Sequence, residues 1–310
     1  MNMKLCPPEI HSYICELACL DDGRAVQALS LVSRYFRDIA RPFLYQSLSI
    51  SGSDKISMLA SELETTPPHL RSMRHLFIST HPTSGKLNNE PTIPSTGLES
   101  TAILRILTLA APTLETLSFV SASPAMSTSS ISRLFRTSFP RLRELSVAGF
   151  YPFPSSPGKM PSLERLHLHG NRNPHGLLQM GGLDEACPSL THLRVSGLSM
   201  AVSFALELQE AFSGVETSPF PSKLPPGVRH VVLEPAPPFP FPASGKPAAS
   251  HARDQLMMEQ LEDLTPPQGV EFSLLARADA HIPCDTFRRD WIERLDGTEG
   301  CWATSVETTC

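Results

Sequence analysis

The chain has 310 residues, which is the length of about two domains, and 30 of them are proline. Proline at about twice its ordinary frequency excludes long helices and long central strands, because its ring fixes φ and its nitrogen carries no hydrogen. The formal net charge at pH 7 is −5, without any block of like charge, which argues against nucleic acid as a partner. No apolar run is long enough to span a membrane, so no membrane partner is expected either.

The cysteines indicate a reducing compartment. There are 7 of them, an odd number scattered along the chain, and this does not form the pattern of a disulfide framework. The first residues include no apolar stretch typical of a secretory signal. We therefore expect the protein in the cytoplasm, the nucleus or both, with Cys15 and Cys19 packed in a core.

The first 40 residues predict three short helices. The first is expected to start at Pro7-Pro8, because proline suits the first turn, and it carries Ile10, Ile14 and Leu17 at helical spacing. The other two are expected over 24–33 and 34–40. Helices of this size bury too little surface to be stable alone. They should therefore pack against the rest of the chain or against a partner.

A phrase of the form Pro-x-Leu-x-x-Leu-x-apolar recurs behind these helices. Four copies begin at Pro112, Pro140, Pro161 and Pro188, and looser copies have Met73 and Val228 as the leading apolar residue. Successive leading positions are 41, 28, 21, 27 and 38 residues apart, and the inner three gaps fall within the period of leucine-rich repeats. Apolar stretches of helical spacing lie between the phrases, over 98–111, 130–139 and 199–212. The pattern predicts parallel strands joined by crossover helices, with the leucines packed inward.

The N-terminal segment resembles an F-box over residues 4–46. The resemblance is carried by Cys6-Pro7-Pro8-Glu9-Ile10 and by Leu29-Ser30-Leu31-Val32-Ser33-Arg34-Tyr35-Phe36. The family has leucine where this chain has Cys6, unless Leu5 takes that role. The resemblance implies binding to a Skp-type adaptor and, through it, to a cullin, so that the rest of the chain presents a protein substrate for ubiquitination. The adaptor-facing residues that it implies are Leu5, Cys6, Pro7, Ile10, Ile14, Leu29, Val32 and Arg34. The alternative is that these helices only cap the repeat array.

The whole chain is therefore expected to be an α/β protein, with a three-helix F-box followed by an irregular leucine-rich-repeat solenoid of parallel strands and crossover helices. The predicted domains are 4–46, the repeat array over 47–275, and a capping helix with its tail over 276–310. Val270, Phe272 and Leu274 alternate as a last strand, and Asp285 is expected to cap a final helix over 286–295 that seals the open end of the array. This tail resembles those of fungal leucine-rich F-box proteins. The proline run over 235–242 is either a connector or a ligand for an SH3- or WW-type domain.

Strand alternation predicts which side chains point away from the leucine core. Histidine and arginine are frequent at these positions, and we expect the outward face to bind a protein substrate unless it is an ordinary solvated sheet face. Arg165 and Arg194 would suit a carboxylate or phosphate. The candidate substrate-binding residues are His75, Phe77, Arg165, His167, His169, His192, Arg194 and His230.

Catalytic signatures are missing from the sequence. There is no His-Glu-x-x-His, no phosphate-binding Gly-x-x-x-x-Gly-Lys, no Gly-x-Gly-x-x-Gly and no Gly-x-Ser-x-Gly. His167 and His169, even with His192, make a poor zinc site. We therefore expect no catalytic residue, no metal and no cofactor, and the favoured function is the substrate-recognition subunit of a Skp-cullin-F-box ubiquitin ligase. The alternatives are a leucine-rich binding scaffold without a ligase connection and, more remotely, a metal-dependent hydrolase.

Overall fold

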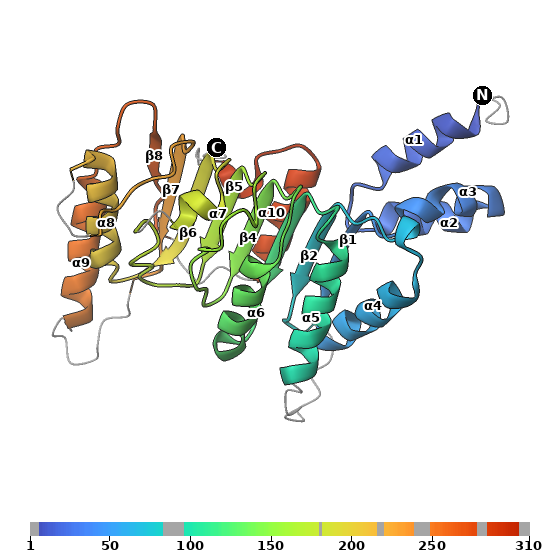
Figure 1. Ribbon diagram of the computed structural model, residues 1–310, viewed down its shortest axis with the longest axis horizontal. Coiled ribbons are helices and arrows are strands. Elements are labelled where there is room, and N and C mark those ends of the chain that lie inside the picture. The colour runs from blue at the N-terminus through green and yellow to red at the C-terminus, as the bar shows by residue number, and fades with distance from the viewer. Residues whose placement is uncertain are drawn as a thin grey trace, which may run out of the picture. The chain divides into compact units, whose positions relative to one another are not determined.

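The computed structural model describes residues 6–82, 96–179, 182–215, 220–238, 249–277 and 284–303 (Figure 1). The chain forms two compact units. Unit 1 comprises Met1–Ala122 with Cys284–Cys301, and unit 2 comprises Ser123–Pro283 with Trp302–Cys310. Each unit combines helices with parallel strands, as the predicted α/β class requires. The N-terminal helices belong to unit 1 together with the first strands.

The three N-terminal helices form where the sequence predicts them, as α1 (Pro8–Ala18), α2 (Arg24–Val32) and α3 (Arg34–Ala40). Pro8 lies in the first turn of α1, and the Ser33 hydroxyl caps α3 by accepting the N–H of Phe36. A small core of Cys19, Val26 and Ala40 holds the helices together. Cys15 and Cys19 are buried, as predicted. A short 3₁₀ turn, η2 (Arg41–Phe43), follows α3.

Unit 1 contains three parallel strands, β1 (Ser47–Ser51), β2 (His75–Ser79) and β3 (Thr116–Val120), with the helices α4 (Ser53–Thr65) and α5 (Thr96–Ala110) and the 3₁₀ turn η3 (Pro68–Leu70). Strand β1 and helix α4 were not predicted. Tyr45 supplies the missing signal, because it precedes Leu48 and Ile50 at the spacing of the repeated phrase, and Leu48 pairs in register with Leu76. The repeat therefore begins one copy earlier than the leucine pattern indicated.

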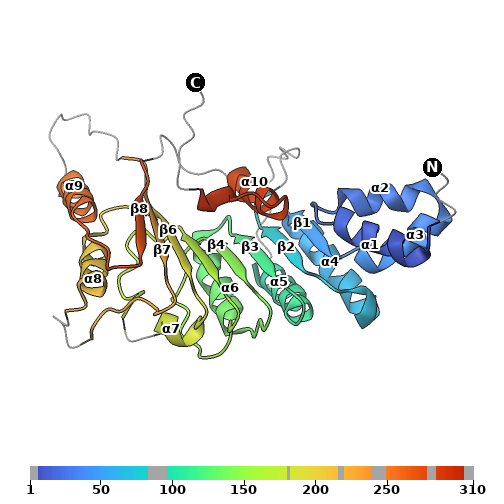
Figure 2. The same cartoon turned by 90° about the horizontal axis from the view of Figure 1, so that it is seen from above.

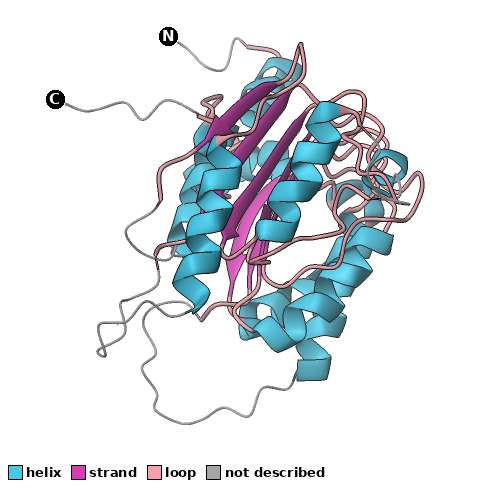
Figure 3. Cartoon of the chain, turned by 90° about the vertical axis from the view of Figure 1, so that its left-hand side faces the viewer, coloured by secondary structure: helices cyan, strands magenta, loops and turns pink. Residues whose placement is uncertain are grey.

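Unit 2 contains five parallel strands in chain order, β4 (Glu144–Ala148), β5 (Arg165–His169), β6 (His192–Leu198), β7 (His230–Pro235) and β8 (Glu271–Leu274). Its helices are α6 (Pro124–Arg136), α7 (Gly182–Ala186), α8 (Val202–Ser213) and α9 (Ala249–Glu262), and helices flank the strands (Figure 3). Strand β8 was predicted, whereas α7 and α9 were not. The proline run begins at the end of β7, and its residues from 239 onward lie outside the described residues.

The leading apolar residues of the repeats form the core, as predicted. Leu114, Leu142, Leu163 and Leu190 are each 0% exposed. Within unit 2 the next leucines stack in register from strand to strand, since Leu145 pairs with Leu166 and Leu166 pairs with Leu193. Each buried leucine contributes roughly 1.5–3 kcal/mol, but only because the neighbouring repeat covers it.

The C-terminal helix α10 (Cys284–Leu295) corrects one prediction. It does not seal the open end of the array; it contacts β2 and β3 on the side opposite α4 and α5 (Figure 2). Trp291 packs on Phe77 with ring centroids 6.0 Å apart, and Arg288 donates to Ser49 Oγ at 2.9 Å and pairs with Asp22. Asp285 lies in the first turn and is not the cap, because the helix already begins at Cys284. A 3₁₀ turn, η4 (Gly300–Trp302), follows.

Among the helices built from described residues, none combines the length and the apolar character needed to cross a membrane.

Candidate functional site

The N-terminal helices expose their apolar side chains. Helix α1 buries His11 and Cys15, yet it leaves Ile10 47%, Ile14 53% and Leu17 53% exposed. Seven of the fourteen large apolar side chains exposed among the described residues lie between positions 10 and 35. We call them the N-terminal apolar set: Ile10, Tyr13, Ile14, Leu17, Leu31, Val32 and Tyr35. A helix that buries its less apolar side has an apolar side available for a partner.

Most of the predicted adaptor-facing residues are accessible. Ile10, Ile14 and Val32 belong to the N-terminal apolar set, and Cys6, Pro7 and Arg34 are also exposed. Leu5 lies outside the described residues. Leu29 requires a correction, because it packs against the small core of Cys19, Val26 and Ala40 and so supports the helices from within.

The predicted adaptor-facing set did not include Tyr13, Leu17, Leu31 or Tyr35. Leu31 is the most exposed of them, at 83%. The sequence could have predicted this exposure, because Leu31 stands next to Val32 and two residues after Leu29. One face of a helix cannot bury all three side chains. Tyr35 is held close to α1, because its hydroxyl lies 2.7 Å from His11 Nδ1 and the two rings meet edge to face.

The second candidate site is the outward face of the strands. Alternation places the predicted histidines and arginines opposite the leucines, but the expectation of an open face is wrong for several of them. His75 is 8%, Phe77 0%, His167 2% and Arg194 8% exposed. The period of a strand shows which side chains share a face and carries no information on what covers that face.

In unit 1, helix α10 supplies the cover. All five residues of β2 are buried, Phe77 beneath Trp291. Burial lowers the pKa of His75 to about 4, because the imidazolium loses its hydration there. His75 Nδ1 lies 3.1 Å from Thr116 Oγ1 on the neighbouring strand. His75 and Phe77 therefore serve the packing of this unit.

In unit 2, the histidines of β5 join a network around Ser196. Its Oγ lies 2.7 Å from His167 Nε2 and 3.0 Å from His169 Nδ1. Burial holds the pKa of His167 well below its ordinary value, and the positive charge of Arg194 acts in the same direction. His167 is thus a neutral, packed imidazole within the strand face.

The two arginines that were predicted to bind an anion already meet carboxylates of the chain. Arg194 Nη2 lies 2.6 Å from Glu234 Oε2, with both side chains nearly buried, and Arg165 Nη1 lies 3.8 Å from Glu144 Oε2. The prediction of an external carboxylate or phosphate is therefore corrected for Arg194, whereas for Arg165, which is 28% exposed, it stays a prediction. Strands β6 and β7 place Glu234 beside Arg194, and the buried pair compensates the desolvation of its members.

A tryptophan from the C-terminal segment occupies this face of unit 2. The Trp302 Nε1–H donates to Glu144 Oε1 at 3.0 Å, and the indole is 7% exposed. Its ring meets His192 and His167 edge to face, with centroids 5.7 Å and 6.4 Å away. The sequence did not indicate this role for Trp302 or Glu144, because no local pattern joins two positions 158 residues apart.

Beyond Trp302, the histidines of β6 and β7 stack on each other. The rings of His192 and His230 lie 4.3 Å apart at an interplanar angle of 16°, and His230 Nδ1 is 3.0 Å from Glu271 Oε2. His230 keeps 41% of its side chain exposed. At this end of unit 2 the strand face is accessible at His230 and along β8, none of whose residues is buried.

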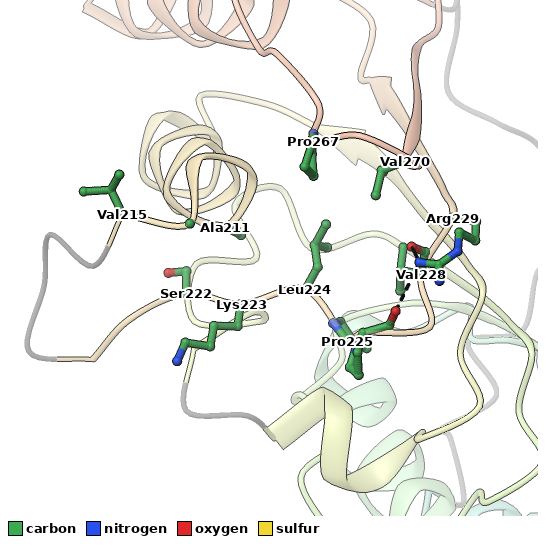
Figure 4. Close-up of a pocket in the computed structure, with 12 residues that line it drawn as sticks. Ala211, Val215, Ser222, Lys223, Leu224, Pro225, Val228, Arg229, Pro267 and Val270 are labelled. Atoms are coloured by element: carbon green, nitrogen blue, oxygen red, sulfur yellow. Dashed lines mark hydrogen bonds between the residues drawn. The ribbon is translucent and has the colours of Figure 1, made fainter.

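The described part of the chain holds no cluster of three or more His, Cys, Asp or Glu side chains arranged to bind a metal ion. An open pocket with a volume of about 320 Å³ lies in unit 2, beside the end of α8 and the turn before β7 (Figure 4). Its apolar walls are formed by Pro225, Pro267, Val228 and Val270. The guanidinium of Arg229 donates to the carbonyl oxygens of Pro226 and Val228. The pocket gathers no pair of acid and base that would support catalysis.

No model of a known protein family matches the sequence, and no curated protein matches it in a sequence search. The class that the fold itself defines is an α/β protein whose repeated strands run parallel within each unit.

Proposed function

We propose that this protein is a substrate-recognition subunit of a Skp-cullin-F-box type ubiquitin ligase, without catalysis of its own. The observation that carries the proposal is the N-terminal apolar set, exposed on helices whose sequence resembles an F-box. The three helices form where proline and the apolar spacing predict them. Exposed leucine, isoleucine and tyrosine side chains on one small helical module are costly in water, and an adaptor would cover them.

The proposed mechanism is proximity. Helices α1 to α3 dock on a Skp-type adaptor and the parallel strands hold a target protein, so that partner enzymes act on a target kept at high local concentration. The strand array suits the holding role because its leucine core is dry and rigid, with the leading leucines fully buried.

The test is adaptor binding by the full chain carrying L31D and V32D together. Both side chains are exposed, at 83% and 66%, so the fold should survive, while binding to a purified Skp-type adaptor should weaken by at least about a hundredfold. The matched control is M58D, since Met58 on α4 is 70% exposed and lies outside the N-terminal helices. Leu29→Asp is unsuitable, because Leu29 belongs to the small core and the variant would lose the module itself.

Calorimetric titration and thermal unfolding measured on the same preparations separate docking from stability. Normal adaptor binding by the double variant would refute the docking surface. A wild-type chain that binds no Skp-type adaptor, and still captures a partner through its strands, would establish the scaffold without a ligase connection instead.

A further inference from the structure

A side chain of the protein itself, that of Trp302, occupies the outward face of strands β4 to β6. Trp302 places its indole against His192 and His167, and its N–H reaches Glu144. The packing is specific in its chemistry. The rings provide an aromatic wall on which an indole packs edge to face, and the carboxylate oxygen accepts the single hydrogen that an indole donates.

Glu144 is oriented for this purpose. One of its oxygens accepts the indole N–H, while the other faces Arg165 Nη1 at 3.8 Å. Its side chain is 16% exposed, so the bond to the indole forms in a largely dry setting, where it is stronger than in water. His192 is in turn supported by the stacked ring of His230. Arg165 and His230 thus act as positioning residues for the groups that touch Trp302.

An anion is a poor occupant of the same place. Arg194 is committed to Glu234 at 2.6 Å, and Glu144 would repel a second carboxylate. An indole brings no charge, and its N–H donates to Glu144. Trp302 therefore shows which chemistry this surface selects, through its hydrogen bond to Glu144 and its ring contacts with His167 and His192.

We propose that Glu144, His167 and His192 form a tryptophan-binding site for a partner protein, and that Trp302 occupies it as an internal competitor. The partner presents a tryptophan on an accessible segment and binds when Trp302 leaves. Only the description of this partner as a ubiquitination target rests on the proposed function; the site itself does not depend on it.

The test uses the full chain carrying W302A and a fluorescein-labelled peptide with the sequence of residues 296–303, Asp-Gly-Thr-Glu-Gly-Cys-Trp-Ala. Fluorescence anisotropy should show saturable binding to W302A and binding at least about tenfold weaker to the wild-type chain, whose site is filled. The same peptide with alanine in place of tryptophan should not bind. Equal binding of the tryptophan peptide to both chains would overturn the proposal.

Two further variants locate the site. W302A/E144A should lose at least about tenfold in peptide affinity, because the indole N–H is left without its acceptor. W302A/E164A should bind the peptide as tightly as W302A does. Glu164 directly precedes β5, its side chain is exposed, and it pairs with Arg143 rather than with Trp302. An E144A variant that binds as tightly as its control would refute the role of Glu144.

A W302F chain keeps a ring in place and guards against loss of folding in W302A. The peptide should bind it more tightly than it binds the wild-type chain, because phenylalanine offers no N–H to Glu144 and is a weaker competitor. A W302F chain that excludes the peptide as well as the wild-type chain does would contradict the proposal. No adaptor is present in these assays, and adaptor binding is measured separately, so a failure of either proposal is visible without the other.

Discussion

The N-terminal helices and the repeated strands use apolar residues in opposite ways. In the strands, the leading leucines are 0% exposed and each repeat covers the next. In the helices, Ile10, Ile14 and Leu31 remain exposed, while the buried positions of α1 are His11 and Cys15. An apolar side chain stabilises the fold only where the same chain covers it. The helices leave much of their apolar surface exposed, whereas the leading leucines of the repeats are covered within the fold.

The largest expected effect tests this difference directly. Leu163→Ala should lower the free energy of unfolding by about 2–5 kcal/mol, because it leaves a cavity in a fully packed layer. Leu31→Ala should change it by less than about 0.5 kcal/mol, since Leu31 is 83% exposed. Urea unfolding followed by circular dichroism measures both. Equal losses in the two variants would mean that the helices hold their leucines as the strands do.

The second expected effect concerns acid. Burial lowers the pKa of His75 to about 4. Between pH 6.5 and about 4, the His75 imidazole is therefore protonated in the unfolded state and neutral in the folded state. This contribution to stability is present above pH 6.5 and should be lost as the pH falls toward 4, by about 3 kcal/mol at most.

The His75→Gln variant should flatten the acid limb of the curve of unfolding free energy against pH. His230→Gln is the control, because that side chain is 41% exposed. An unchanged acid limb in His75→Gln would show that His75 is not buried as the strand packing requires.

The third effect compares two neighbours on α8. Glu207 is 3% exposed and accepts the backbone N–H groups of Gly176 and Leu178, while Leu206 is 49% exposed. Glu207→Ala should cost about 1.5–3 kcal/mol, because one buried and one half-buried backbone N–H lose their acceptor. Leu206→Ala should be nearly neutral in the same urea titration. A larger loss of unfolding free energy in Leu206→Ala than in Glu207→Ala would contradict the burial of Glu207.

The smallest expected effect is a change in affinity for the proposed adaptor when Cys6 is replaced. Cys6 is exposed and stands where the family that the helices resemble has leucine. Cys6→Leu adds apolar surface to an interface, at about 0.8 kcal/mol per buried CH₂ group, and should raise affinity for a Skp-type adaptor by about fourfold or more. Cys6→Ser should lower it, and surface plasmon resonance resolves changes of this size. Identical affinities in all three chains would remove Cys6 from the docking surface.

Local patterns account for much of the fold. The prolines at positions 7 and 8 and the apolar spacing behind them predicted α1. Of the eight strands formed by the described residues, the repeated phrase predicted the six from β2 to β7, and a separate alternation over 270–274 predicted β8. Strand β1 was missed because tyrosine replaces the leading leucine at position 45. The exposure of Leu31 and the burial of Leu29 were not distinguished, because both fit a helix and only the packing of α2 on its neighbours separates them.

The sequence by itself determined where the chain turns, which residues alternate toward the leucine core, and that helices precede the strands. These properties depend on neighbours within a few residues, through backbone sterics and side-chain period. Tertiary structure alone decided what covers the outward strand face. Arg288 meets Asp22 across 266 residues and Trp302 meets Glu144 across 158. Such contacts arise only once folding has brought distant segments together, and no local period encodes them.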